Sequence, residues 1–420
     1  MHNVDASAPT PRKKPIGARF IVTCGVFVGM APAPALGQDG PWTINALIER
    51  GLEHANFEAV RDGEAMAGEG DARRAGRWSN PQLSYQREQL AGSAADLDTL
   101  MVTQRIDVSG RRGLRAEAAT LRTEGRLKRL EWERALYVIQ VRERFYALLY
   151  LQTRAERMES WHQNLKQVHD VIEARVAAGD ASELERRRIG SALSLVESRR
   201  DALAIEREQA WAQLDALVGG LSAGPWPRVQ GELVPEPSPR PPSPDRPDLQ
   251  ALELELRSLA LESDAASRGW VPGLQLGLGY LRQTGGVDGS DDADGFTLTL
   301  NLSLPLFSNG QAEAQSARGE AQALSARRAR AARELERRAG SVEDTLSRHL
   351  ELARAFRQTL ERADETAQLA REAYEGDALP LGELLNVYEH QHDVQEQATA
   401  LAWQARRAYL DALRLHGDRP

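Results

Sequence analysis

The chain has 420 residues, but it contains a single cysteine and its aromatic residues make up only 5% of the total. The lone Cys24 excludes a disulfide within the chain and any cysteine cluster that could hold a metal ion. Few aromatic residues, beside abundant alanine, leucine, glutamate and arginine, disfavour compact cores and favour long helices and coiled coils. The formal net charge of -8 argues against a nucleic-acid partner.

The sequence also lacks the run of about 20 apolar residues that a membrane-spanning helix requires. The apolar stretch from Phe20 to Met30 has 11 residues, follows a basic segment and precedes small residues. This is the pattern of an export signal, and we predict a signal peptide over residues 1–37. Cys24 lies inside it, and Thr23 before Cys24 disfavours a lipid-attachment site. An exported chain of this kind is periplasmic, secreted, or inserted in an outer membrane as β-structure.

Catalytic motifs are missing as well. We find no Gly-rich phosphate loop and no Ser/His/Asp grouping with a motif around it. His390 and His392 are two residues apart on a predicted helix and therefore point in different directions. His162 and His169 are seven residues apart, which is too far for one ion. We predict that the protein is not an enzyme and has no cofactor and no metal site.

What the chain does contain is one pattern, present twice. Around Pro81 and again around Pro272, two short alternating segments precede a very long helical pattern and a shorter returning helix. Each long helix is followed by a Gly-Asp turn, and these two turns are the expected tips of two helical hairpins: Gly179-Asp180 and Gly376-Asp377. The repetition indicates an internal duplication.

The boundaries of the two repeats follow from this pattern. We predict a first repeat over residues 38–221 and a second over residues 249–420, each with a short helix, a β-hairpin and a long helical hairpin. Between them, residues 222–248 are rich in proline, including Pro241-Pro242, and cannot continue a helix. We predict an extended linker there.

The clearest strand pattern runs from Phe296 to Leu306, where large apolar residues alternate with small, polar or proline residues. Such alternation places one row on one face, and eleven residues suit a tilted membrane strand of about 9–11 residues. The expected lipid-facing row is Phe296, Leu298, Leu300, Leu302 and Leu304. Its expected partner strand spans residues 274–280, and a weaker copy of the pair covers residues 83–85 and 100–108.

A soluble hairpin packed on the helices would show the same alternation. If the strands instead enter a membrane, four of them cannot close a barrel, and an open edge is not tolerated in lipid. Several chains must then share one barrel, and three chains would supply about twelve strands, which is within the bacterial range.

The helical patterns are too long for a globular domain. From about Asn309 to Tyr374 there is no proline, and small or apolar residues recur every three or four positions. The expected coiled-coil seam is Ala332, Leu335, Ala339, Val342, Leu346, His349, Ala353, Phe356, Leu360, Ala363, Ala367, Ala370 and Tyr374. A helix of this length extends about 100 Å. Its first-half counterpart covers about 111–176, and returning helices are expected over about 181–218 and 381–415.

Taken together, these features resemble the TolC-like outer-membrane efflux family, and most of all its CzcC-like heavy-metal branch. The segments that carry the resemblance, in order and spacing, are Trp42-Thr43, Asn80-Pro81-Gln82-Leu83, Gln104, Gly110-Arg111-Arg112, Leu217-Val218-Gly219, Arg246-Pro247-Asp248, Leu304-Pro305-Leu306-Phe307, Ala373-Tyr374 and Leu384-Leu385-Asn386. The resemblance implies an α+β membrane protein in which long coiled-coil hairpins adjoin a four-stranded contribution to a shared trimeric β-barrel.

The resemblance also implies a location and partners. A homotrimer would lie in the outer membrane of a Gram-negative bacterium, in contact with lipid, and extend into the periplasm. A periplasmic adaptor would dock at the hairpin tips, on Gly179, Asp180, Gly376 and Asp377, and would connect the protein to an inner-membrane RND-type pump. The protein itself would be the passive exit duct of this tripartite system, with divalent heavy-metal cations as the expected cargo.

Family members carry two inward acidic positions at the closed periplasmic mouth, and the resemblance places them on Glu383 and Asn386. Only the first is acidic here, so a trimer would keep one carboxylate ring as its gate. The basic residue that latches some members falls on Leu379, and Gly376 comes one residue early. Glu383 also fits an ordinary solvated carboxylate at a helix start.

Other functions fit parts of the sequence. A duct for multidrug efflux or type I secretion would show most of the same features. A periplasmic coiled-coil adaptor would need one helical hairpin flanked by small β-rich domains, whereas this chain has two hairpins. A fibrous structural protein would not need the alternation over residues 296–306.

Overall fold

The computed structural model describes residues 41–89, 96–221, 228–236, 246–285 and 292–417. The predicted signal peptide and Cys24 lie outside the described residues, and so does most of the predicted linker.

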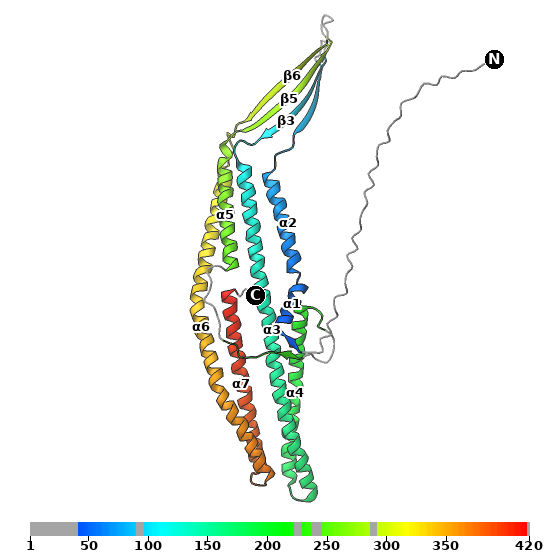
Figure 1. The fold of residues 1–420 in the computed structure, drawn as a ribbon, viewed down its shortest axis with the longest axis vertical. Coiled ribbons are helices and arrows are strands. Elements are labelled where there is room, and N and C mark those ends of the chain that lie inside the picture. The colour runs from blue at the N-terminus through cyan, green and yellow to red at the C-terminus, as the bar shows by residue number, and fades with distance from the viewer. Residues whose placement is uncertain (1–40, 90–95, 222–227, 237–245, 286–291, 418–420) are drawn as a thin grey trace, which may run out of the picture. The chain divides into compact units, whose positions relative to one another are not determined.

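The two halves of the chain repeat the same order of elements (Figure 1). The first half contains β1 (Trp42–Thr43), α1 (Ile44–His54), α2 (Phe57–Gly76), β2 (Gln82–Gln89), β3 (Asp96–Ile106), α3 (Arg111–Ala178) and α4 (Glu183–Val218). The second contains β4 (Val229–Gln230), α5 (Pro247–Ser267), the short 3-10 helix η1 (Arg268–Trp270), β5 (Gly273–Thr284), β6 (Ala293–Ser303), α6 (Gln311–Glu375) and α7 (Leu381–His416).

The lengths of corresponding helices confirm the predicted duplication. The long helices α3 and α6 have 68 and 65 residues, and the returning helices α4 and α7 have 36 each. The preceding helices α2 and α5 have 20 and 21 residues. Because α5 begins at Pro247, the predicted linker ends two residues earlier than residue 248.

Each long helix starts from a glycine in the left-handed conformation, Gly110 (φ 69°) and Gly310 (φ 82°). At Gly310 a Cβ atom would lie 2.0 Å from the carbonyl oxygen of Ala266, so backbone packing excludes any larger residue. Helix α4 starts with a capping box in which Ser182 and Glu185 satisfy each other's backbone N–H groups. These local signals set where the strands give way to helices and where the first hairpin returns.

The helices pack side by side, and α3 contacts most of the others. Helix α3 packs against α2 and α4, and also against α5 and α7, while α6 packs against α5 and α7. In the view of Figure 1, α5 and α7 lie between α3 and α6. The sheet adjoins one end of the long helices and the two hairpin tips lie at the other.

Burial along α6 follows the predicted coiled-coil seam. All of the predicted seam residues are buried or half-buried, and Leu346, Ala363, Ala367, Ala370 and Tyr374 are fully buried. Small alanines at many of these positions allow close approach of α7. The predicted seam is therefore confirmed.

Two large apolar cores and two smaller ones hold the described helices together. At the tips, one core combines Ile172 of α3 and Ile189 of α4 with Tyr374 of α6 and Leu384 of α7, so it joins the two hairpins. The second surrounds Phe145 of α3 and includes parts of α1, α4 and β4.

The described part of the linker crosses this second core. Gly231 lies over Phe145, and the guanidinium of Arg406 on α7 donates hydrogen bonds to the carbonyls of Glu232 (2.6 Å) and Leu233 (2.9 Å). The linker therefore ties the second hairpin to the first.

The four longer strands form one antiparallel sheet in the order β2-β3-β5-β6. Strands β2 and β6 are its edges, and β1 and β4 form a separate parallel pair. The predicted strand over 296–306 ends earlier than expected, because β6 stops at Ser303 and Leu304 lies beyond it, before Pro305. Proline has no N–H for a ladder, which explains this end.

None of the described helices combines the length and the apolar character that crossing a bilayer demands.

Candidate transport surfaces

One face of the sheet is apolar across all four strands. The register places Leu302 opposite Leu274, Leu300 opposite Leu276, and Leu298 opposite Leu278. Val102 and Leu83 continue the row of Leu278 onto β3 and β2. Phe296, Leu298 and Leu300 are 82%, 78% and 63% exposed, so no described part of the chain covers this face.

At one end of the strands, the apolar face is bordered by two successive rows of residues. The first is largely aromatic and consists of Tyr85, Leu100, Tyr280 and Phe296. The next row carries alternating charges and consists of Arg87, Asp98, Arg282 and Asp294. The hydroxyl of Tyr85 donates a hydrogen bond to Asp98 (2.6 Å) and so connects the two rows.

The height of this face suits a bilayer. From Phe296 to Leu302 the strand rises about 20 Å. The apolar band of outer-membrane barrels is about 25 Å tall and is bordered by aromatic residues. The four strands therefore carry an apolar band with an aromatic border and a charged limit.

The opposite face of the sheet is largely polar, and its side chains on β6 are small. Thr297, Thr299, Asn301 and Ser303 of β6 lie on it beside Gly277 and Gly279 of β5. A Cβ atom at Gly277 would lie 2.9 Å from the methyl carbon of Thr103, so these glycines make room for branched neighbours. This face matches the permissive wall of a polar duct.

The foot of the sheet is held by Asp107, directly after β3. Its carboxylate accepts hydrogen bonds from the N–H groups of Ser109 (3.0 Å) and Arg112 (3.2 Å) and from the Arg112 guanidinium (3.2 Å). Partial burial raises the pKa of Asp107, but these hydrogen bonds outweigh burial and lower the pKa to about 2. The Arg112 guanidinium also lies over the ring of Trp78, 3.6 Å from its centroid. Together these contacts fix the turn from β3 into α3.

The two hairpin tips share one backbone motif. At the first tip the N–H of Gly179 bonds to the carbonyl of Val176 and that of Asp180 to Arg175, which is a Schellman motif. The second tip repeats it with Asp377 bonded to Tyr374 and Ala378 to Ala373.

Asp377 rather than Gly376 therefore corresponds to Gly179. Asp377 adopts the left-handed conformation (φ 56°), whereas Gly376 does not (φ −85°). This shift agrees with the expectation that Gly376 comes one residue early. A left-handed non-glycine residue costs about 1 kcal/mol, although aspartate tolerates this conformation better than most.

Asp377 also connects the two hairpins. It forms an ion pair with Arg175, near the end of α3, and the Arg175 guanidinium lies 5.9 Å from the ring centroid of Tyr374. Because both partners are at least one-third exposed, the pair contributes little to folding. We did not predict this contact from the sequence, since its partners are 202 residues apart. Leu379, at the position of the family's basic latch residue, is half-buried and packs against the tip core.

The predicted gate residues lie on one exposed face of α7. Glu383 and Asn386 are exposed, while Leu381, Leu384 and Leu385 between and beside them are buried in the tip core. Glu383 occupies the first turn of the helix, where a carboxylate favours the helix dipole. The geometry brings the two residues together on one side, and their gating role stays a prediction.

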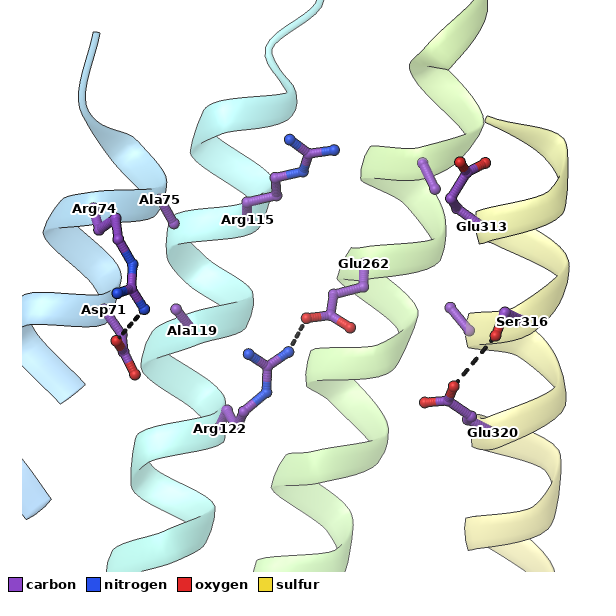
Figure 2. A pocket seen from close by; sticks show the side chains of 12 residues that line it. Asp71, Arg74, Ala75, Arg115, Ala119, Arg122, Glu262, Glu313, Ser316 and Glu320 are labelled. Atoms are coloured by element: carbon purple, nitrogen blue, oxygen red, sulfur yellow. Dashed lines mark hydrogen bonds and ion pairs between the residues drawn. The ribbon is translucent and has the colours of Figure 1, made fainter. Parts of the chain in front are cut away.

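A charged cavity of about 530 Å³ lies between α2, α3, α5 and α6, below the sheet (Figure 2). Its charges are largely paired: Arg74 with Asp71 (2.6 Å) and Arg122 with Glu262.

No group of three or more histidine, cysteine, aspartate or glutamate side chains among the described residues is placed to hold a metal ion. His392 is buried against Trp161 and His390 is exposed, so these two point apart as predicted.

Comparisons with known proteins show which family and which solved structures this chain resembles. Residues 244–414 match the family model described as outer membrane efflux protein. This match lies within the second half of the chain. No curated protein matches the chain.

Solved structures of similar fold cover nearly all of the chain. VceC of Vibrio cholerae, an outer membrane protein, has 17% identity and a TM-score of 0.66 over 89% of this chain and 96% of its own. CusC has 17% identity and a TM-score of 0.66 over 91% and 96%. The MtrE outer membrane channel of Neisseria gonorrhoeae has 16% identity and a TM-score of 0.64 over 89% and 88%.

The family match and these folds support the predicted TolC-like outer-membrane efflux family. The predicted fold class, with two long helical hairpins, a four-stranded sheet and an internal duplication, is confirmed. The CzcC-like branch is not distinguished, because VceC, CusC and MtrE are about equally similar to this chain.

Proposed function

We propose that the protein is the outer-membrane exit channel of a tripartite efflux system. The observation that carries this proposal is the sheet, with one apolar face bordered by an aromatic row and a charged row, and with two edges that pair with nothing in the described chain. The family match over residues 244–414 supports the same reading.

The free edges require a shared barrel. Unpaired N–H and C=O groups on β2 and β6 would each cost several kcal/mol in lipid. Because β2 and β6 run antiparallel within the sheet, β6 of one copy can pair with β2 of the next. Three copies would close about twelve strands, as expected for a bacterial outer-membrane barrel.

The helices extend the duct away from the membrane. Their tips, at Gly179 and Asp377, lie at the end opposite the sheet, where a periplasmic adaptor would dock and link the channel to an RND-type pump. The rival function, a periplasmic adaptor, is less well supported, since the chain has two helical hairpins and a sheet with a fully exposed apolar face.

Two cargo classes fit this duct. The resemblance to the heavy-metal branch favours divalent metal cations, which a ring of Glu383 carboxylates at the mouth would attract. Multidrug or protein export is the second class. The fold is similar to CusC and to MtrE alike, so cargo is decided by experiment.

Deletion of the gene should sensitise the native bacterium to the cargo. Growth is measured against divalent metal salts and against a panel of drugs, with complementation by the intact gene as the control. Sensitivity to metals alone supports the metal branch, and sensitivity to drugs alone contradicts it.

The tagged protein should fractionate with the outer membrane as a trimer; a soluble monomer would overturn the channel itself.

Replacing Leu300 by arginine tests which face of the sheet meets lipid. A charge at the bilayer midplane destabilises an outer-membrane barrel by about 2–4 kcal/mol, so L300R should reduce the amount of assembled trimer. The matched control is T299R, the neighbouring residue on the polar face, which should assemble close to normally. Trimer yield on unheated gels gives the comparison. Normal assembly of L300R with failure of T299R would mean that the faces are reversed.

The Arg175–Asp377 pair is proposed to hold the tip closed. R175Q and D377N, which keeps a residue that accepts the left-handed conformation, should each raise the resting conductance of the channel in planar bilayers. An exposed pair is worth up to about 1 kcal/mol, so the open fraction should rise by up to about fivefold. R371Q is the control, because Arg371 pairs with Glu375 inside α6 (3.0 Å). If R175Q, D377N and R371Q all conduct like the wild type, the Arg175–Asp377 pair does not hold the tip closed.

A further inference from the structure

The foot of the sheet carries an unusual excess of positive charge. A cavity of about 330 Å³ lies between the end of α2, the end of β3 and the start of α3. Its lining contains one carboxylate, Asp107, and six arginines, namely Arg74, Arg77, Arg105, Arg111, Arg112 and Arg115. The lining therefore has five more positive than negative charges.

Most of this charge is not neutralised. Asp107 is occupied by Arg112 and Ser109, and Arg74 pairs with Asp71 outside the cavity. The Nε atom of Arg111 donates to the neutral hydroxyl of Ser109 (3.1 Å).

The other three arginines of this cavity are Arg77, Arg105 and Arg115. Across the described ranges, none of their guanidinium groups has a carboxylate partner. They are exposed, as a site open to passing solutes requires.

The strand register shows which wall this charge belongs to. Arg105 lies directly opposite Gln275, which in turn lies opposite Asn301. This row belongs to the polar face of the sheet, together with Thr103 and Thr299. In the proposed barrel that face is the inner wall of the duct.

A second cavity, of about 510 Å³, supports the same placement. It is lined by polar-face residues, including Gln275, Asn301 and Ser303, and again by Arg105 and Arg111. The two cavities therefore share Arg105 and Arg111 in their linings, at the junction between sheet and helices.

We propose that Arg105 and Arg111 form an anion-binding belt on the inner wall of the duct, at the foot of the sheet. The proposal rests on the proposed channel function, since only a closed trimer brings three copies of the pair around one lumen. Guanidinium groups bind carboxylate and phosphate groups through paired hydrogen bonds. The belt accordingly favours solutes that carry such groups and repels free metal cations at this level of the duct.

The test is the ion selectivity of the purified trimer in a planar bilayer. Under a potassium chloride gradient, the reversal potential of the wild-type channel gives its chloride-to-potassium permeability ratio, which the belt raises and the Glu383 ring at the mouth lowers. R105Q should reduce the chloride-to-potassium permeability ratio by about tenfold or more, because like-charged walls concentrate counter-ions by at least that factor. R105K, which keeps the charge, should retain most of the ratio. Inorganic phosphate should reduce chloride current through the wild type and have a weaker effect on R105Q.

The control is R330Q, which removes an exposed arginine without a described partner from α6, away from the sheet. Its permeability ratio should match that of the wild type. An R105Q channel with unchanged selectivity would overturn the belt and leave the channel intact. A purified protein that forms no conducting pore would instead refute the proposed function, and the belt with it.

Discussion

The constraint on which the structure depends is that a four-stranded sheet with an apolar face has two unpaired edges. Within the described chain nothing pairs with the outer side of β2 or β6, and nothing covers Phe296, Leu298 or Leu300. In water, exposure of the apolar face would cost free energy. In lipid, the unpaired backbone N–H and C=O groups of the two edges would cost free energy instead. Only a closed ring of copies in a bilayer removes both costs. The proposed shared barrel follows from this requirement, with the polar face of the sheet turned toward its lumen.

The helices meet a different requirement. A wall of single helices has no globular interior, so its stability comes from seams between neighbours, with alanines at many contact positions of α6. The tip core is the exception, because it combines large residues from both hairpins, including Ile172, Tyr374 and Leu384. Separation of the two hairpins would therefore disturb an apolar core as well as the exposed Arg175–Asp377 pair. Because an exposed ion pair is weak, the core contributes most of the attraction between them.

Features that depend on local periodicity were predictable from the sequence. The alternation over residues 296–303 gave the apolar row, and the three-four spacing over residues 332–374 gave the seam of α6. Local chemistry also explains the errors at the strand ends: Pro305 stops β6 before Leu304, and hydrogen bonds from Ser109 and Arg112 to Asp107 turn the chain after β3.

Features that depend on pairing between distant segments were not predictable. The charged row across Arg87, Asp98, Arg282 and Asp294 exists only through the register of four strands from both repeats. The left-handed residue at the second tip is Asp377 because the hydrogen-bond pattern of the hairpin selects it, although Gly376 is the better residue for that conformation. Of the candidate site, the sequence supplied the residues of the apolar row and the tips, while the contacts between them required the fold.

The central claim, that β6 of one copy pairs with β2 of the next, can be tested by disulfide cross-linking in the outer membrane. In a background where Cys24 is replaced by serine, Ser84→Cys on β2 is combined in turn with Thr297→Cys, Thr299→Cys or Asn301→Cys on β6. Oxidation should link chains into dimers and trimers for the pair in register, and each single variant should stay unlinked. Absence of linked species for every pair, in protein shown to be in the outer membrane, would contradict the shared barrel.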